Sequence, residues 1–285
     1  MNKVKYPLNY IGGKYKLIES LRDLFPKKIS MFYDVFGGGG NVCLNIDSEY
    51  KYYNDINKYV VSILKGIQDN KIENTIHKID ETINTYKLSK MNKEGFEKLR
   101  NDYNNGKNDW ITLFVLVAYS FNYQMRFNNN HQYNSSFGKD RSCFTDNMRK
   151  NLINISERIK NCEITFDCND FRSVDFSDAD ENDLVYFDPP YLLSCGVYQD
   201  GKRGFSGWSE KDEIDLYNLC DKLDEQGTRF ALSNVMESKG KVNEILKEWS
   251  KKYFVYYLDK EYGNSNYQRK NRTGDVEVLI TNYQA

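Results

Sequence analysis

The sequence predicts an α/β protein whose mainly parallel, doubly wound sheet is interrupted by a mostly helical insertion. Strand-like apolar runs alternate with amphipathic segments before residue 56 and after residue 160, a pattern typical of a parallel sheet covered by helices. A run of glycines follows the first strand-like segment, and residues 57–159 show helical periodicity instead. The chain therefore divides into one domain, formed by 1–56 and 160–285, and an inserted subdomain, 57–159.

The first part of the chain predicts one helix and two short strands. Apolar residues recur at helical spacing until Pro26 stops the pattern; they are Leu17, Ile18, Leu21 and Leu24. Segment 31–36 predicts a strand, and the glycine run begins directly after it. Segment 50–55 predicts a second strand, which ends at Asp55.

The inserted subdomain carries a different pattern. Isoleucines step by four, three and four residues, which indicates an amphipathic helix; they are Ile72, Ile76, Ile79 and Ile83. The apolar run 110–121 fits a buried helix or a strand, and its length favours a helix. Segment 122–137 is rich in Asn and aromatic residues, and its triple Asn at 128–130 predicts the turn of a hairpin.

The α/β alternation resumes after residue 160. Five segments predict strands, at 162–166, 183–187, 229–234, 253–258 and 276–283. A helix is expected over 209–223, with Ser209 as its N-cap, and another over 241–249.

Composition excludes several functional classes. The chain has 285 residues, of which 40% are hydrophobic and 28% charged, so it can bury a large core. No run approaches the roughly 18 apolar residues of a membrane span, and the six Cys form no CxxC pair, so we expect a cytoplasmic protein with reduced thiols. Two His leave little for a metal site, and none is expected. The net charge of −1 does not itself indicate a nucleic-acid binder.

The glycine run suggests a ligand loop. Open α/β sheets bind ligands at the carboxyl ends of their strands, and the run 37–40 follows a predicted strand directly. Asp55 comes 17 residues after Gly38, at the end of the next strand, where a carboxylate can accept both hydroxyls of a ribose. The dinucleotide spacing G-x-G-x-x-G is absent. The pattern fits a nucleoside cofactor, and a plain glycine-rich turn is the alternative.

The segment Asp188–Tyr191, with the sequence DPPY, is more specific. It follows an apolar run typical of a central parallel strand. The carboxylate of Asp188 and the carbonyl of Pro189 can accept hydrogen bonds from the two N–H groups of an exocyclic base amine, and Pro190 stiffens the same turn. Tyr191 can stack on the base, which must first be flipped out of duplex DNA. The alternative is a rigid exit from a strand.

These motifs together resemble the Dam-type DNA adenine-N6 methyltransferases, the group alpha or D12 class, over nearly the full length. Residues 9–21 resemble the N-terminal motif, with Tyr10 in place of the usual Trp and with the Lys kept as Lys14. DVFGGGGNV matches the cofactor loop through Phe36, Gly38 and Gly40. The segment 168–171 resembles the one beside the cofactor's adenine, through Asp170 and Phe171. FALSN (230–234) and EVLITNY (277–283) match later strands.

The resemblance implies a Rossmann-like methyltransferase fold, S-adenosylmethionine as cofactor, and double-stranded DNA as substrate. By the same resemblance, Asp55 binds the ribose, Asp188–Tyr191 form the catalytic motif, and 57–159 is the target-recognition subdomain. It also implies a monomer or weak dimer, and a possible cognate restriction endonuclease that acts on the same site without direct contact. Transfer needs no metal in this class.

The hairpin near 122–137 resembles the recognition element of the family, in which an Arg reads guanine. Arg126 occupies that position, and Arg on guanine O6/N7 is the commonest specific base contact. The resemblance also places Tyr123, Gln124, Asn128 and Lys139 at the DNA. It implies a site containing GAT, most simply GATC. Departures at Tyr123, Gln124 and Ser136 keep a longer asymmetric site, such as GGATG, as an alternative.

Other activities fit less well. Methylation of cytosine N4 usually uses a motif that begins with Ser, and methylation of an RNA base or a protein glutamine usually uses one that begins with Asn. Methylation of cytosine C5 needs a Cys that follows Pro, a dipeptide absent from the chain. A NAD-dependent oxidoreductase would explain the glycine loop but not DPPY. A non-catalytic DNA-binding module would not need Lys14, Asp55 and Asp188 together.

Overall fold

The protein is built on one mixed sheet in which all but one of the long strands run parallel. The computed structural model describes residues 2–10, 12–193, 207–258 and 275–285. Within them the strand order is β3-β2-β1-β4-β5-β8-β7, and β6 pairs with β5. The strands are β1 (Met31–Asp34), β2 (Tyr50–Asn54), β3 (Glu163–Asp167), β4 (Leu184–Phe187), β5 (Arg229–Ser238), β6 (Lys241–Val242), β7 (Phe254–Tyr257) and β8 (Val276–Thr281). The predicted α/β class is confirmed.

The strand order reverses between β1 and β4. The chain runs outward from β1 to β2 and β3 and then returns to place β4 on the other side of β1. The two strands pair in parallel, with Asp34 opposite Tyr186. All four β4 residues are buried, as expected of a central strand. Crevices at such reversals are the usual ligand sites of open α/β sheets.

The remaining edge of the sheet is antiparallel. β8 runs against both β5 and β7, and this brings residues near the C-terminus next to the centre of the sheet. One helix prediction in this region is confirmed except for its first three residues. The helix expected over 241–249 is preceded by the short strand β6, and α8 (Glu244–Trp249) begins only after Asn243, whose side chain caps it by accepting from the amide of Leu246.

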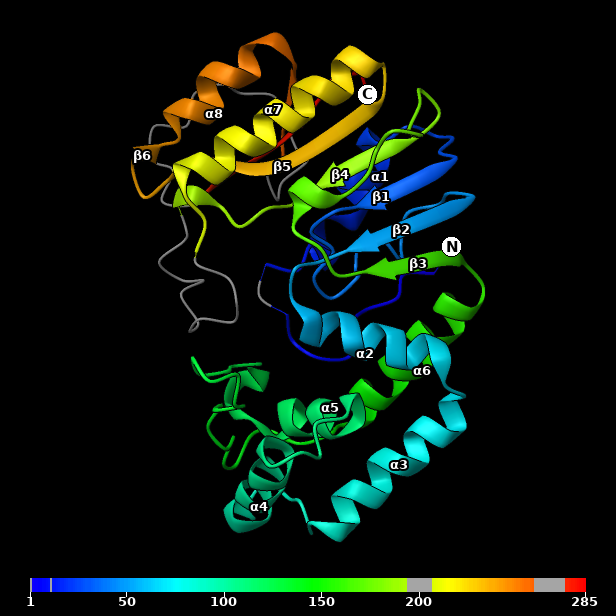
Figure 1. Ribbon diagram of the computed structural model, residues 1–285, viewed down its shortest axis with the longest axis vertical. Helices are drawn as coiled ribbons and strands as arrows, with labels where there is room; N and C mark the ends of the chain where they lie inside the picture. The colour runs from blue at the N-terminus through cyan, green and yellow to red at the C-terminus, as the bar shows by residue number, and fades with distance from the viewer. Residues whose placement is uncertain (1, 11, 194–206, 259–274) are drawn as a thin grey trace.

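Helices cover the sheet and extend beyond its β3 edge (Figure 1). The first helix is α1 (Ile18–Leu24), which follows a 3₁₀ turn, and α7 (Glu210–Gln226) and α8 pack against β5. Ser209 caps α7 in a capping box with Asp212, so the predicted cap is confirmed. The helices of the insertion are α2 (Lys58–Asp69), α3 (Ile72–Thr85), α4 (Lys93–Asn104), α5 (Trp110–Tyr119) and α6 (Asp146–Lys160).

Helix α5 is the centre of the insertion. Residues 111–119 are all buried, and α2, α3 and α4 pack around them. The Asp109 side chain caps the helix by accepting from the amides of Ile111 and Thr112. The preference for a helix over 110–121 is therefore confirmed. A helix that is apolar on every side is stable only when other elements enclose it.

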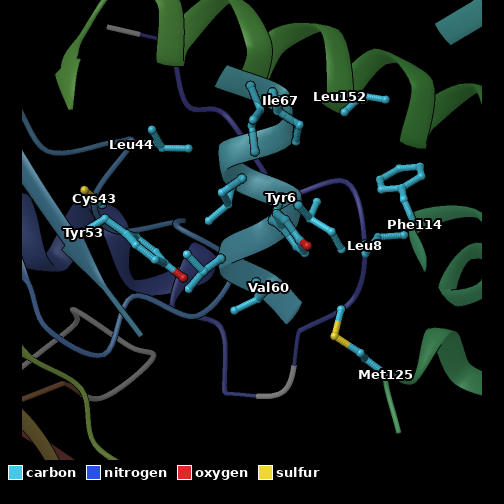
Figure 2. Packing of buried hydrophobic residues seen from close by; sticks show 14 of the residues in the cluster. Tyr6, Leu8, Cys43, Leu44, Tyr53, Val60, Ile67, Phe114, Met125 and Leu152 are labelled. Carbon is cyan, nitrogen blue, oxygen red and sulfur yellow. The ribbon is translucent and has the colours of Figure 1, made fainter. Parts of the chain in front are cut away.

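The insertion and the sheet share one continuous apolar core. Helix α2 packs against β3 on one side and α5 on the other, and α6 also contacts β3. Figure 2 shows side chains of the sheet region, such as Tyr53 and Leu44, on one side of α2 and those of Phe114 and Leu152 on the other. The division of the chain at residues 57 and 159 into two functional units stays a prediction.

The expected hairpin is a loop held by two isolated bridges. Ser120 pairs with Phe137, and Phe127 pairs with Tyr133, both antiparallel. The Asn128 side chain organises the turn by accepting from the amides of Asn130 and Gln132.

Among the described residues, no helix is long and apolar enough to cross a bilayer.

The close approach of α2 and α5 generates a prediction. A Cβ added at Gly66 would lie 2.3 Å from the indole of Trp110. Ala normally stabilises a helix interior by about 1 kcal/mol relative to Gly, but overpacking costs about 1–3 kcal/mol. We expect Gly66→Ala to lower the free energy of unfolding in urea, while Ser62→Ala on the exposed face of α2 changes it by less than about 0.5 kcal/mol. A more stable Gly66→Ala protein would contradict this packing.

Candidate active site

A cavity of about 630 Å³ lies where β1, β2 and β4 end. It collects nearly all of the predicted cofactor and catalytic residues. Those that line it are Tyr10, Lys14, Phe36, Gly38, Asp55, Asp170, Phe171, Asp188, Pro189, Pro190 and Tyr191. A cavity of this size is in the usual range for a small-molecule site. These residues come together because β1 and β4 are neighbouring strands, at the point where the strand order of the sheet reverses.

The glycine loop approaches the cavity with its backbone. Gly38 adopts φ +51°, and a Cβ there would lie 2.8 Å from the ring of Tyr10. Both conditions favour Gly. The hydroxyl of Tyr53, on β2, donates to the carbonyl of Gly38 at 2.5 Å and so fixes the glycine loop to the sheet. Gly40, also predicted to bind cofactor, does not line the cavity; it closes the turn by donating to the carbonyl of Gly37 at 2.8 Å.

Asp55 is held by two backbone amides. Its carboxylate oxygens accept from Gly38 N at 2.8 Å and Asn57 N at 2.7 Å. Burial raises the pKa of Asp55 to about 6, and the two amides oppose that rise. The group is therefore mostly ionised at neutral pH, and its remaining lone pairs can accept hydroxyl donors that enter the cavity.

Asp188 sits in a compact polar cluster at the end of β4. Its Oδ1 atom lies 2.8 Å from Lys14 Nζ and accepts from the Tyr191 hydroxyl at 2.9 Å. Lys14 Nζ also lies 4.9 Å from the centre of the Tyr191 ring. Burial raises the pKa of the Asp188 carboxyl, while Lys14 and the Tyr191 hydroxyl act to lower it. Lys14, predicted to lie at the cofactor, thus also contacts the segment Asp188–Tyr191.

The sequence did not indicate the fourth member of this cluster, Glu277 on β8. Its Oε1 atom accepts from the Tyr191 hydroxyl at 2.9 Å and lies 3.3 Å from Lys14 Nζ. Glu277 is the first residue of the EVLITNY segment, which was interpreted only as a strand. The contact depends on the antiparallel placement of β8 beside β5, and no local pattern predicts that order.

Aromatic rings form one wall of the cavity. Phe36 lies 5.4 Å from Phe171 and 5.7 Å from Trp208, measured between ring centres. Trp208 was also missed from the sequence. Such rings offer a flat, apolar slot for a planar heterocycle.

Asp170 stands beside this wall, but its carboxylate is already engaged. It caps the short 3₁₀ turn that holds Phe171 by accepting from the Arg172 amide at 2.9 Å. The Arg172 side chain then bridges Asp170 and Asp212, and its guanidinium lies 4.4 Å from the centre of the Phe171 ring. This ion-pair network fixes Phe171 against α7.

The segment after α5 reaches the same cavity from the insertion. Tyr123 and Gln124, predicted to bind DNA, line it together with Asn122 and Met125. Asn122 and Tyr123 have φ of 54° and 56°, a conformation that non-glycine residues rarely adopt. Such strain often marks functional segments. The structure therefore brings part of the predicted recognition hairpin to the cavity that Asp188–Tyr191 line.

The other predicted DNA-binding residues lie away from the cavity. Arg126 and Lys139 are exposed, and Asn128 lies in the turn of the hairpin. The backbone of Arg126 is fixed because its amide donates to Ser135 Oγ at 3.0 Å and its carbonyl accepts from the Asn134 amide at 3.0 Å.

In the described part of the chain, no group of three or more His, Cys, Asp or Glu is arranged to hold a metal ion.

Comparison with known proteins finds relatives among the DNA methyltransferases. The chain is 46% identical over 98% of its length to Type II methyltransferase M.FokI of Planomicrobium okeanokoites, and 45% identical over 99% to Modification methylase StsI of Streptococcus sanguinis. It spans 43% of the length of each of these relatives. The DNA adenine methylase of Escherichia coli K12 is 25% identical over 82% of both chains.

A family model describes the same region. The model of the D12 class N6 adenine-specific DNA methyltransferases matches residues 10–264, which include the glycine loop, the insertion and the Asp188–Tyr191 motif. Together with the two relatives above 40% identity, this match assigns the family. The chain belongs to the D12 class of N6 adenine-specific DNA methyltransferases.

Proposed function

We propose that this chain transfers a methyl group from S-adenosylmethionine to N6 of an adenine flipped out of duplex DNA. The observation that carries the proposal is the position of Asp188, which lines the same cavity as the glycine loop and Asp55. One part of the cavity suits a nucleoside, and the adjoining part holds a partly buried carboxylate that can accept an amine. Family membership supports the choice of adenine N6.

The residues fit the cofactor by three separate features. The loop at Gly38 has no side chain where the Tyr10 ring approaches, so backbone and ring can contact a ligand together. Asp55 is a buried acceptor suited to ribose hydroxyls. The rings of Phe36, Phe171 and Trp208 offer a slot for an adenine ring. When bound, S-adenosylmethionine supplies a methyl group on a sulfonium sulfur, which takes the C–S electron pair as the new C–N bond forms.

The chain's own residues position and deprotonate the target amine. Asp188 accepts one N–H of the amine and the Pro189 carbonyl accepts the other, which directs the nitrogen lone pair towards the methyl group. As the nitrogen bonds to carbon it gains positive charge, which the Asp188 carboxylate stabilises. Asp188 then receives the proton, and the N–H bonding pair returns to nitrogen. The Tyr191 ring stacks on the base.

Sequence selection belongs to the insertion in this proposal. We assign 57–159 as the target-recognition subdomain, with Arg126 reading a guanine and with Tyr123, Gln124, Asn128 and Lys139 at the DNA. The exposed Arg126 side chain on a fixed backbone supports base reading. The proposed site contains GAT, in GATC or in a longer asymmetric sequence such as GGATG.

The names of two relatives support a role in restriction and modification. One is called a type II methyltransferase and the other a modification methylase. We propose that a cognate restriction endonuclease acts on the same site without direct contact with this chain. We also propose that the protein works in the cytoplasm, as a monomer or weak dimer.

Replacement of the catalytic carboxylate tests the proposed reaction. Asp188→Ala removes both the acceptor of the amine and the acceptor of its proton, so we expect the rate of methyl transfer to fall by on the order of 10² or more. Formation of N6-methyladenine is measured in digested DNA after incubation with labelled S-adenosylmethionine. The exposed Asp178→Ala protein serves as the matched control and should keep the wild-type rate.

The product distinguishes the rival reactions. Wild-type protein that forms only N4-methylcytosine, or no methylated base in DNA at all, would refute the proposed function. An Asp188→Ala protein that retains a tenth of the wild-type rate would refute the role of this residue alone.

Asp55 should act on cofactor affinity. Asp55→Ala loses the proposed ribose acceptor and the anchor of the Gly38 amide, so we expect the dissociation constant of S-adenosylmethionine to rise by about tenfold or more. Calorimetric titration of the protein without DNA measures it. Asp47→Ala, at an exposed position, is the control. An unaltered dissociation constant in Asp55→Ala would remove Asp55 from the cofactor site.

Arg126 should act on sequence selectivity. A bidentate contact from Arg to guanine discriminates by about 1–3 kcal/mol, so Arg126→Ala should relax selection at one guanine position. Methylation rates on duplexes that differ singly around GAT provide the measurement. Lys139→Ala is the contrasting variant, because loss of a phosphate contact weakens all sequences alike and reduces the salt slope by about 1. An equal loss on every duplex in Arg126→Ala would contradict base reading.

A further inference from the structure

Glu277 shares both partners of the catalytic carboxylate. Lys14 Nζ lies 2.8 Å from Asp188 Oδ1 and 3.3 Å from Glu277 Oε1. The Tyr191 hydroxyl lies 2.9 Å from each of the same two oxygens. One ammonium group and one hydroxyl thus bridge two carboxylates that come from different strands. Glu277 is 25% exposed and Lys14 only 6%, so the shared cation is more buried than the second carboxylate.

The charges of this cluster have a simple consequence. Lys14 and Asp188 alone would form a neutral ion pair, in which the ammonium weakens the carboxylate as a hydrogen-bond acceptor and as a base. Glu277 adds a second negative charge beside the same ammonium, so the three charged side chains sum to −1. A nitrogen that gains positive charge during methyl transfer is stabilised by a net negative environment.

The hydroxyl of Tyr191 adds a second consequence. It carries a single proton and faces two acceptors, so it can donate to only one of them at a time. When a target amine takes Asp188 as its acceptor, the hydroxyl can donate to Glu277 instead. Without Glu277 the hydroxyl would donate to Asp188, and that hydrogen bond would withdraw negative charge from the carboxylate that receives the amine.

We propose that Glu277 is a positioning residue for methyl transfer, which shares Lys14 and the Tyr191 hydroxyl with Asp188 and so keeps the amine-binding carboxylate a strong and available hydrogen-bond acceptor and base. This inference rests on the proposed function, because it concerns the group that receives the amine. It assigns a role to β8 that the fold alone does not require. Glu277 acts through Lys14 and Tyr191 and does not touch the amine.

The first test measures the charge coupling in the protein alone, without DNA or cofactor. The carboxyl carbon resonance of Asp188, assigned by its loss in Asp188→Asn, is followed against pH. Lys14, Tyr191 and Glu277 face this carboxyl directly, and Asp34 and Tyr186 lie nearby in the sheet. Glu277 raises the pKa of Asp188 and Lys14 lowers it. Glu277→Gln should therefore shift the Asp188 titration to lower pH.

A double variant makes the test specific to charge. Lys14→Gln in the Glu277→Gln background removes the ammonium that Glu277 had offset, so the Asp188 titration should move back to higher pH. Glu237→Gln, on the neighbouring strand β5 and outside the cluster, is the matched control and should leave the titration unchanged. A titration that is the same in wild type and Glu277→Gln would overturn the proposal.

The second test measures transfer in a single turnover with saturating DNA and S-adenosylmethionine. We expect Glu277→Gln to slow transfer by about ten- to a hundredfold, with unchanged dissociation constants for DNA and cofactor. The acidic limb of its pH–rate profile should move to lower pH, because the carboxylate form of Asp188 then persists further into acid. Glu277→Asp, which keeps the charge, should recover much of the rate.

The outcomes separate this inference from the proposed function. Wild-type protein without adenine methylation would refute the proposed function, whatever the Asp188 titration shows. Active wild-type protein with an equally active Glu277→Gln variant would overturn the role of Glu277 alone. Equal losses in Glu277→Gln and Glu277→Asp, with no shift of the acidic limb, would reduce Glu277 to a packing role and also overturn the proposal.

Discussion

The parallel pairing of β1 with β4 is the constraint on which the rest of the site depends. Because Asp34 lies opposite Tyr186 in this pairing, the loops that follow the two strands begin side by side and must diverge. The space between them is the cavity, with the glycine loop on one side and the Asp188 motif on the other. The insertion is accommodated because it leaves the sheet after β2 and returns at β3, on the far side from β4.

Three carboxylates gather at the ends of neighbouring strands, and this sets the electrostatics of the cavity. Asp34 ends β1, Asp55 follows β2 and Asp188 follows β4. Burial raises the pKa of Asp34 to about 8, against the single amide of Cys43 that donates to it at 3.0 Å. Burial also raises the pKa of Asp55 and Asp188. Burial therefore disfavours negative charge on all three carboxyls, whereas the two amides at Asp55 and the Lys14 ammonium at Asp188 favour the ionised form of those two.

The sequence predicted those features that depend on short segments, and it failed where distant segments meet. The apolar run before Asp188 and the glycine run each marked a strand end, so most of the residues predicted from them line one cavity. Glu277 could not, because its contact with Lys14 depends on the position of β8 in the sheet. Trp208 precedes a helix cap without any pattern of its own. The short strand β6 was mistaken for helix because two residues are too few to show a period of two.

The shared core around α2 has a consequence for how specificity can change. A recognition unit that is tethered only by flexible linkers can be exchanged between relatives without disturbing catalysis. Here α2 and α6 contact both β3 and the other helices of the insertion, so the insertion is fixed to the sheet by close packing. A graft of foreign helices into the insertion would have to carry the matching faces of α2 and α6. With the proposed role of the hairpin, selectivity is expected to diverge by substitutions in the hairpin, while the insertion as a whole is inherited together with its sheet.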